Sequence, residues 1–153
     1  MCTSFLGELL SATHNFSSAN PAHTAATADT FKAALYLASA TVNASTTAYT
    51  TTGEASGTGY TAGGVTVTNA TNPSSTNTSA TAGTGYWTPS ASLSWSNLTQ
   101  ATAFDTVLIY NSTQSNKAVS VHTFGSQTIT AGTFTLTMPS NTTSTALLRL
   151  ATT

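Results

Sequence analysis

The residues best suited to chemistry are the four acids and three histidines, because the chain carries only seven formally charged side chains among 153 residues. Glycoside hydrolysis uses two carboxylates on either side of a sugar bond. Asp29, Glu54 and Asp105 are the candidates for such a pair, but no shared motif brings any two of them together. The acids therefore single out no catalytic pair.

Two overlapping Gly-rich segments come close to known motifs without matching them. In 53–57 the sequence is GEASG, so Ser56 stands one place late for the G-x-S-x-G turn of a nucleophilic serine. In 57–64 the sequence is GTGYTAGG, whose third Gly is one place late for a dinucleotide-binding loop. A predicted strand, 65–68, follows where that motif needs a helix. We expect these glycines to let the chain turn tightly and approach another backbone closely.

The histidines and the single cysteine form no metal-binding pattern. His14 and His23 are nine residues apart in a predicted loop, and His122 lies on a predicted strand. Cys2 has no second cysteine with which to form a disulfide. None of these spacings matches a zinc or calcium site. We therefore expect no metal, no cofactor and no enzymatic activity.

The charge balance argues against two classes of partner. A net charge of −1 with three basic side chains does not suit a nucleic-acid groove, which needs several cations on one face. The longest apolar stretch, 31–38, contains Lys32 and is far shorter than the ~20 residues of a membrane-spanning helix. The first residues include Glu8 and no basic segment, which is unlike a signal peptide. We expect the chain to fold in the cytoplasm and bind neither nucleic acid nor membrane.

One helix is predicted, over 3–14. Phe5, Leu6, Leu9 and Leu10 recur at helical spacing, and Glu8 lies on the other side. A helix this short is marginal by itself. Its apolar stripe must therefore dock on the rest of the domain or on another chain.

The remainder is rich in Thr, Ala and Ser, which fill 80 positions, and its period-two alternation predicts strands. Segment 29–39 is apolar on both faces, which suits a central strand. The other predicted strands are 65–68, 91–96, 103–111, 118–124, 128–130, 133–138 and 146–151. We predict a single domain over 1–153, an antiparallel β-sandwich of jelly-roll or immunoglobulin-like type. Long Thr/Ser/Gly-rich loops join its strands, and 69–90 has the composition of an inserted loop.

Three segments carry a family resemblance: 30–41 (TFKAALYLASAT), 46–54 (TTAYTTTGE) and the Gly-rich 57–64. Together they resemble a widespread family of small tailed-bacteriophage virion proteins, in which an amphipathic N-terminal segment precedes the Thr-Phe-Lys strand. Later segments, 104–111, 121–125 and 132–136, are also similar. The chain departs from the family pattern at 17–28 and 69–90.

The resemblance implies a structural part of the virion and brings no catalytic residues. We expect a capsid cement or decoration protein on the capsid exterior, which bridges major capsid protein subunits as a homo-oligomer. The alternative is a tail fibre or spike component that binds host surface glycans. The predicted interface residues are the helix stripe and the loop aromatics: Phe5, Leu6, Leu9, Leu10, Tyr49, Tyr60, Tyr86 and Trp87.

Overall fold

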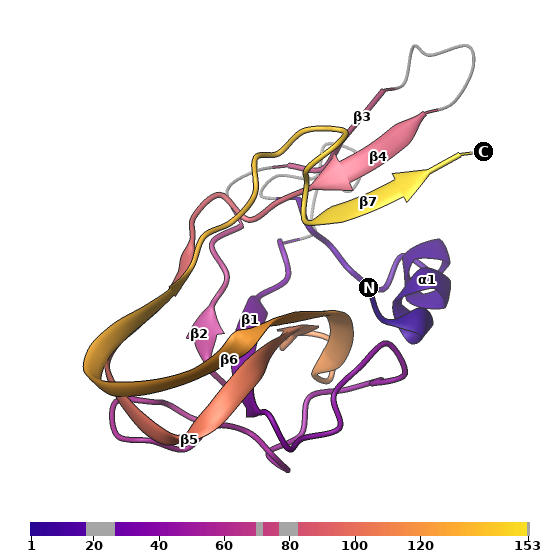
Figure 1. The fold of residues 1–153 in the computed structure, drawn as a ribbon. Helices are drawn as coiled ribbons and strands as arrows, with labels where there is room; N and C mark the ends of the chain where they lie inside the picture. The colour runs from indigo at the N-terminus through magenta and orange to yellow at the C-terminus, as the bar shows by residue number, and fades with distance from the viewer. Residues whose placement is uncertain (18–26, 70–71, 77–82, 153) are drawn as a thin grey trace.

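In the computed structural model the described residues are 1–17, 27–69, 72–76 and 83–152, and they form an almost purely β fold (Figure 1). The N-terminal helix is α1 (Thr3–Leu10). The strands are β1 (Phe31–Leu37), β2 (Val65–Thr66), β3 (Ser74–Ser75), β4 (Thr84–Trp87), β5 (Leu93–Asn111), β6 (Lys117–Leu136) and β7 (Leu148–Ala151). They make two antiparallel sheets, of order β2-β1-β5-β6 and β3-β4-β7. The predicted all-β class, with antiparallel sheets and one short helix, is confirmed.

Strand β1 lies in the middle of the larger sheet, as its two apolar faces predicted. It pairs with β2 on one side and along its whole length with β5 on the other. Phe31, Leu35 and Tyr36 are fully buried. Both faces of β1 are therefore covered, which is why its sequence lacks a polar face.

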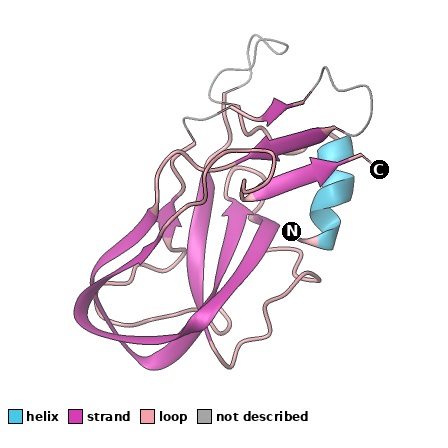
Figure 2. Cartoon of the chain, turned by 45° about the horizontal axis from the view of Figure 1, so that its top comes forward, coloured by secondary structure: helices cyan, strands magenta, loops and turns pink. Residues whose placement is uncertain are grey.

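The second half of the chain is one long hairpin rather than the separate strands we predicted. Strand β5 is 19 residues long and β6 is 20, and their register shifts several times between Trp95 and Thr106. Such irregularities turn side chains to another face without ending the strand, so the alternation breaks while the pairing continues. Figure 2 shows the bent hairpin reaching from the larger sheet towards the smaller one. Its turn spans 112–116, where Ser115 and Asn116 have positive φ.

The smaller sheet contains residues that we predicted as loop. The prediction of 69–90 as an inserted loop is wrong for Ser74–Ser75 and Thr84–Trp87, which are strands, while 70–71 and 77–82 lie outside the described residues. Strand β4 is only four residues long and contains a Gly, so its local pattern is weak. Its partner β7 pairs Ala151 with Thr84, far apart in the sequence.

An aromatic cluster joins α1 and the smaller sheet to the larger one. Phe16 stacks on Phe31 at 4.4 Å between ring centroids and contacts Trp87 at 4.8 Å and Phe5 at 5.8 Å. All four rings are buried. The helix stops at Leu10, before the predicted end at residue 14, because the chain turns away through Ala12 at positive φ. Within the described ranges, no helix is long and apolar enough to cross a membrane.

Candidate functional site

The first group of ionisable residues ties α1 to the β5–β6 turn. Lys117 Nζ donates to Glu8 Oε1 at 2.8 Å, and Glu8 Oε2 lies 2.8 Å from His14 Nε2. The amide nitrogen of Asn111 lies 3.0 Å from His14 Nδ1 and also donates to Asp29 at 2.7 Å. Because an amide nitrogen only donates, His14 accepts at Nδ1 and donates at Nε2 to Glu8. Partial burial raises the pKa of Glu8, but the bonds from Lys117 and His14 outweigh it and leave that pKa below its usual value.

This arrangement contains an acid and a histidine but offers no nucleophile. Both ring nitrogens of His14 are already used, one by Glu8 and one by Asn111. Asp29 accepts further bonds from the Asn15 backbone at 2.8 Å and the Gln114 side chain at 3.2 Å. The network therefore holds the N-terminal segment in place rather than activating a hydroxyl or thiol.

Glu54 is the centre of a second polar cluster, formed mainly by tyrosines. Its two carboxylate oxygens accept from Tyr49 OH at 2.6 Å, Tyr60 OH at 2.7 Å and the Gly63 backbone at 2.7 Å. Burial, and then the nearby Glu54 charge, raise the pKa of Tyr110 to about 12, and burial likewise raises that of Tyr36 to about 12. Burial first, and then the hydrogen bond to Glu54, also raise the pKa of Tyr49 and of Tyr60. The phenols stay neutral donors, and Glu54 is buried and fully used.

Two of the three candidate glycosidase acids, Asp29 and Glu54, do not form a pair. Asp29 precedes the first residue of β1, whereas Glu54 bridges to Tyr36 near the last. At ~3.3 Å per residue the backbones of these acids are more than about 15 Å apart, beyond the roughly 5–9.5 Å of catalytic pairs. Asp105 accepts a bond from the Thr106 hydroxyl at 2.7 Å.

The other groups that the sequence suggested are placed as follows. His23 lies outside the described residues, and burial lowers the pKa of His122 to about 4. Among the residues that the structure describes, no group of three or more His, Cys, Asp or Glu is arranged to hold a metal. Cys2 is buried, and burial raises the pKa of its thiol.

The Gly-rich loop packs against the sheet, as expected. A Cβ at Gly57, Gly59 or Gly64 would lie 2.0, 2.1 or 1.8 Å from a backbone carbonyl oxygen of the neighbouring strand regions. No side chain other than hydrogen fits there. The predicted close approach of backbones is confirmed, and these glycines serve packing.

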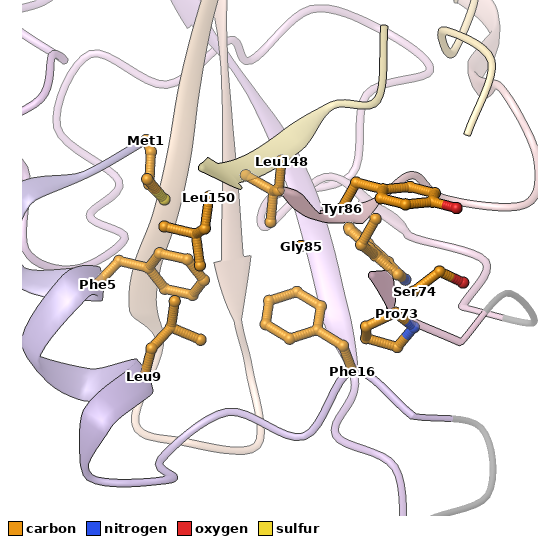
Figure 3. Close-up of a pocket in the computed structure, with 11 residues that line it drawn as sticks. Met1, Phe5, Leu9, Phe16, Pro73, Ser74, Gly85, Tyr86, Leu148 and Leu150 are labelled. Carbon is orange, nitrogen blue, oxygen red and sulfur yellow. The ribbon is translucent and has the colours of Figure 1, made fainter. Parts of the chain in front are cut away.

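An apolar pocket of about 170 Å³ opens between α1 and the smaller sheet (Figure 3). No lining side chain is charged. The lining residues are Met1, Phe5, Leu9, Phe16, Pro73, Ser74, Gly85, Tyr86, Trp87, Leu148 and Leu150. The pocket lacks the convergent polar groups that orient a small substrate, so its chemistry suits apolar contact.

The exposed apolar side chains gather on the same two elements and the N-terminus. We define the apolar rim as Met1, Leu6, Leu10 and Leu150, whose exposed fractions are 39, 44, 93 and 45%. Met1 and Leu150 also line the pocket, and Leu6 and Leu10 project from α1. Among the residues that the structure describes, these four are the large hydrophobic side chains that are exposed. Exposed apolar side chains beside an apolar pocket, as at Met1 and Leu150, are candidates for a contact surface.

Six of the eight predicted interface residues divide into three groups. Leu6 and Leu10 are exposed, and Leu9 and Tyr86 are half-buried in the pocket lining. Tyr49 and Tyr60 are half-buried and donate to Glu54.

Two of the predicted interface residues, Phe5 and Trp87, are buried within the chain. They are 1 and 3% exposed because the aromatic cluster between helix and sheets encloses them. Trp87 is therefore not the exposed loop aromatic that we predicted, whereas Phe5 docks on its own domain, one of the two outcomes expected for the helix stripe. The prediction also missed Met1 and Leu150. The alternation of Leu148 and Leu150 along 146–151 was the available signal for the latter.

Comparison with protein-family models, curated proteins and solved structures finds no match to this chain.

Proposed function

We propose that this chain is a structural protein of a tailed-phage virion, which decorates the capsid exterior and stabilises it by binding across neighbouring major capsid protein subunits. One observation carries the proposal. All four acidic side chains already accept hydrogen bonds from the protein, whereas the large apolar side chains of the apolar rim, on α1, on β7 and at the N-terminus, are left exposed. Ionisable groups thus hold the fold together, and the surface offers contact area.

The sparse charge fits a protein that must stay bound when salt changes. Contacts made by apolar and hydroxyl groups are little affected by ionic screening, whereas those made by exposed ion pairs weaken as salt rises. In a shell with many identical sites, modest binding at each site raises the stability of the whole, since only the assembled state binds. The motif resemblance of 30–64 to phage virion proteins supports the same class.

The arrangement of aromatic rings favours capsid binding over glycan binding. The glycan-binding alternative relies on loop aromatics, and a ring must be exposed if a sugar is to stack on it. The chain has six Phe, five Tyr and two Trp, all within the described residues, and none is among the exposed large hydrophobic side chains. Tyr49 and Tyr60, two of the predicted anchors, use their hydroxyls internally on Glu54.

The test is binding to expanded capsids that lack this protein. We expect purified chain to bind them, to raise their disruption temperature, and to change affinity less than about tenfold between low and high salt. Leu10→Ser should weaken binding because Leu10 is the most exposed rim residue. Thr133→Ser, an exposed change on β6, is the matched control. Absence of binding together with an unchanged disruption temperature would contradict the proposal.

A further inference from the structure

Four strands lie at the edges of the two sheets: β2, β3, β6 and β7. Of these edge strands, β7 is the best suited to pair with a strand of another chain. Strands β2 and β3 are two residues long. Strand β6 is interrupted by register shifts, and its first residues are covered by backbone bonds from Thr47 and Cys2. Strand β7 pairs with β4 without irregularity and forms one edge of the smaller sheet, on the side of the N-terminus and α1 (Figure 1). Regular, exposed edge strands are templates for strand addition.

The hydrogen-bond pattern shows which backbone groups of β7 face outward. Thr152 N–H donates to Gly83 C=O at 2.9 Å. Because bonded and non-bonded pairs alternate along an antiparallel ladder, Leu150 and Leu148 are bonded to β4. The N–H and C=O groups of Arg149 and Ala151 therefore point away from β4, to the open edge.

We propose that β7 pairs antiparallel with β7 of a second copy of this chain, with Arg149 opposite Ala151 of the second copy. This register uses both outward residues of each strand. It joins the two small sheets, of three strands each, into one continuous sheet. The twofold axis then passes beside Leu150, which faces its own counterpart.

Charge and burial select this register and a second copy as the partner. Leu150 is 45% exposed, and facing another Leu150 covers it with an identical apolar side chain. The alternative register with Arg149 opposite Arg149 would bring like charges together. In the chosen register Arg149 meets Ala151, and its guanidinium stays on the Ser144 carbonyl, 2.7 Å away in the same chain. Arg149 is the one charged side chain in β7.

The inference concerns the chain by itself and does not rest on capsid binding. The first experiment is sedimentation of the purified full-length protein over a wide concentration range. We expect a reversible dimer of twice the 15.5 kDa chain mass. Ala151→Pro should weaken it at least about tenfold, since proline removes an N–H that β4 does not use. Thr133→Lys, a change at an exposed residue of β6 outside the proposed edge, should leave the dimer intact.

The second experiment tests the register directly. In a non-bonded antiparallel pair the Cα atoms are about 4.5 Å apart, within reach of a disulfide. Leu150→Cys should therefore form a symmetric cross-link under mild oxidation, while the native Cys2 is buried. Thr152→Cys is the matched control, because its two copies would stand four residues out of register, roughly 13 Å apart.

Three results would overturn the inference: a monomer at every concentration, a dimer unaffected by Ala151→Pro, or equal cross-linking by the two cysteine variants. The first of these leaves capsid binding untouched, so the two proposals fail separately. The cysteine pair decides the matter even if Ala151→Pro disturbs folding.

Discussion

The same four residues, Gly-Thr-Gly-Tyr, occur at 57–60 and again at 83–86, and they adopt two different structures. The first copy is a loop that lies on the larger sheet, with Gly59 at φ +80° and Tyr60 bonded to Glu54. The second copy forms part of β4, with Tyr86 half-buried in the apolar pocket. The same four residues therefore form a loop in one place and part of a strand in the other, and the neighbouring backbone determines which structure they adopt.

The contacts around each copy explain the difference. Gly59 lies against the Asn97 carbonyl, where even a Cβ would come within 2.1 Å. At Gly85 the nearest atom to such a Cβ is the Leu150 oxygen at 3.9 Å, an ordinary contact. Tyr60 OH accepts from the Leu35 backbone at 3.0 Å and donates to Glu54, whereas the Tyr86 hydroxyl bonds to no residue that the structure describes. The first copy is enclosed, and the second is open.

Alkaline pH should destabilise the tyrosine cluster that encloses the first copy. Tyr36 and Tyr110, beside Tyr60 in the Glu54 cluster, have pKa values raised to about 12. A phenol in the unfolded chain ionises near pH 10, so stability is full below that pH and is lost as the pH rises from about 10 towards 12. We expect a loss of about 1 kcal/mol for each such tyrosine at pH 11. Denaturant unfolding at pH 8, 10 and 11 measures this loss, and equal stability at all three would refute an enclosed cluster.

The two glycines should respond in opposite directions. Gly59→Ala should lower the free energy of unfolding by about 2–4 kcal/mol, because it combines a left-handed φ with a backbone clash. Gly85→Ala should be neutral or stabilise by about 0.5 kcal/mol, since alanine loses less backbone entropy in a strand. Urea unfolding of both variants tests the contrast. Similar destabilisation by the two changes would show that the second copy is also enclosed.

The tyrosines of the two copies, Tyr60 and Tyr86, should differ in the same direction as the glycines but by less: removing a hydroxyl should lower stability more in the first copy than in the second. Tyr60→Phe leaves the Leu35 N–H and one Glu54 oxygen with one partner fewer, which should cost about 1–3 kcal/mol. Tyr86→Phe should change stability by less than about 0.5 kcal/mol. Thermal unfolding of the matched pair is the measurement. A larger cost at Tyr86 than at Tyr60 would reverse the comparison.

The threonines of the two copies, Thr58 and Thr84, should differ least in their effect on stability. Thr58 is exposed and bonds Thr99 through its backbone, and Thr84 likewise uses its backbone N–H on Thr76. Replacing either with valine should alter stability by less than about 0.5 kcal/mol. A large effect at Thr58 alone would mean that its hydroxyl, and not the neighbouring glycines, holds the loop.

The sequence by itself determined the class of the fold and several local features. Alternating β-branched residues predicted an antiparallel β protein, the two apolar faces of 31–37 placed that strand in the middle of a sheet, and the Gly-rich run predicted close backbone approach. These features depend on side chains a few residues apart, so the local pattern contains them. Leu6 and Leu10 were found in the same way, from helical spacing.

Tertiary structure decided everything that depends on distant partners. It buried Phe5 and Trp87 in one aromatic cluster and paired 84–87 with a strand that begins at Leu148. It also surrounded Glu54 with the hydroxyls of Tyr49 and Tyr60, an arrangement that no local pattern around Glu54 indicates. Each of these outcomes required two segments to meet, and the free energy gained there comes from burial and hydrogen bonding that neither segment makes alone.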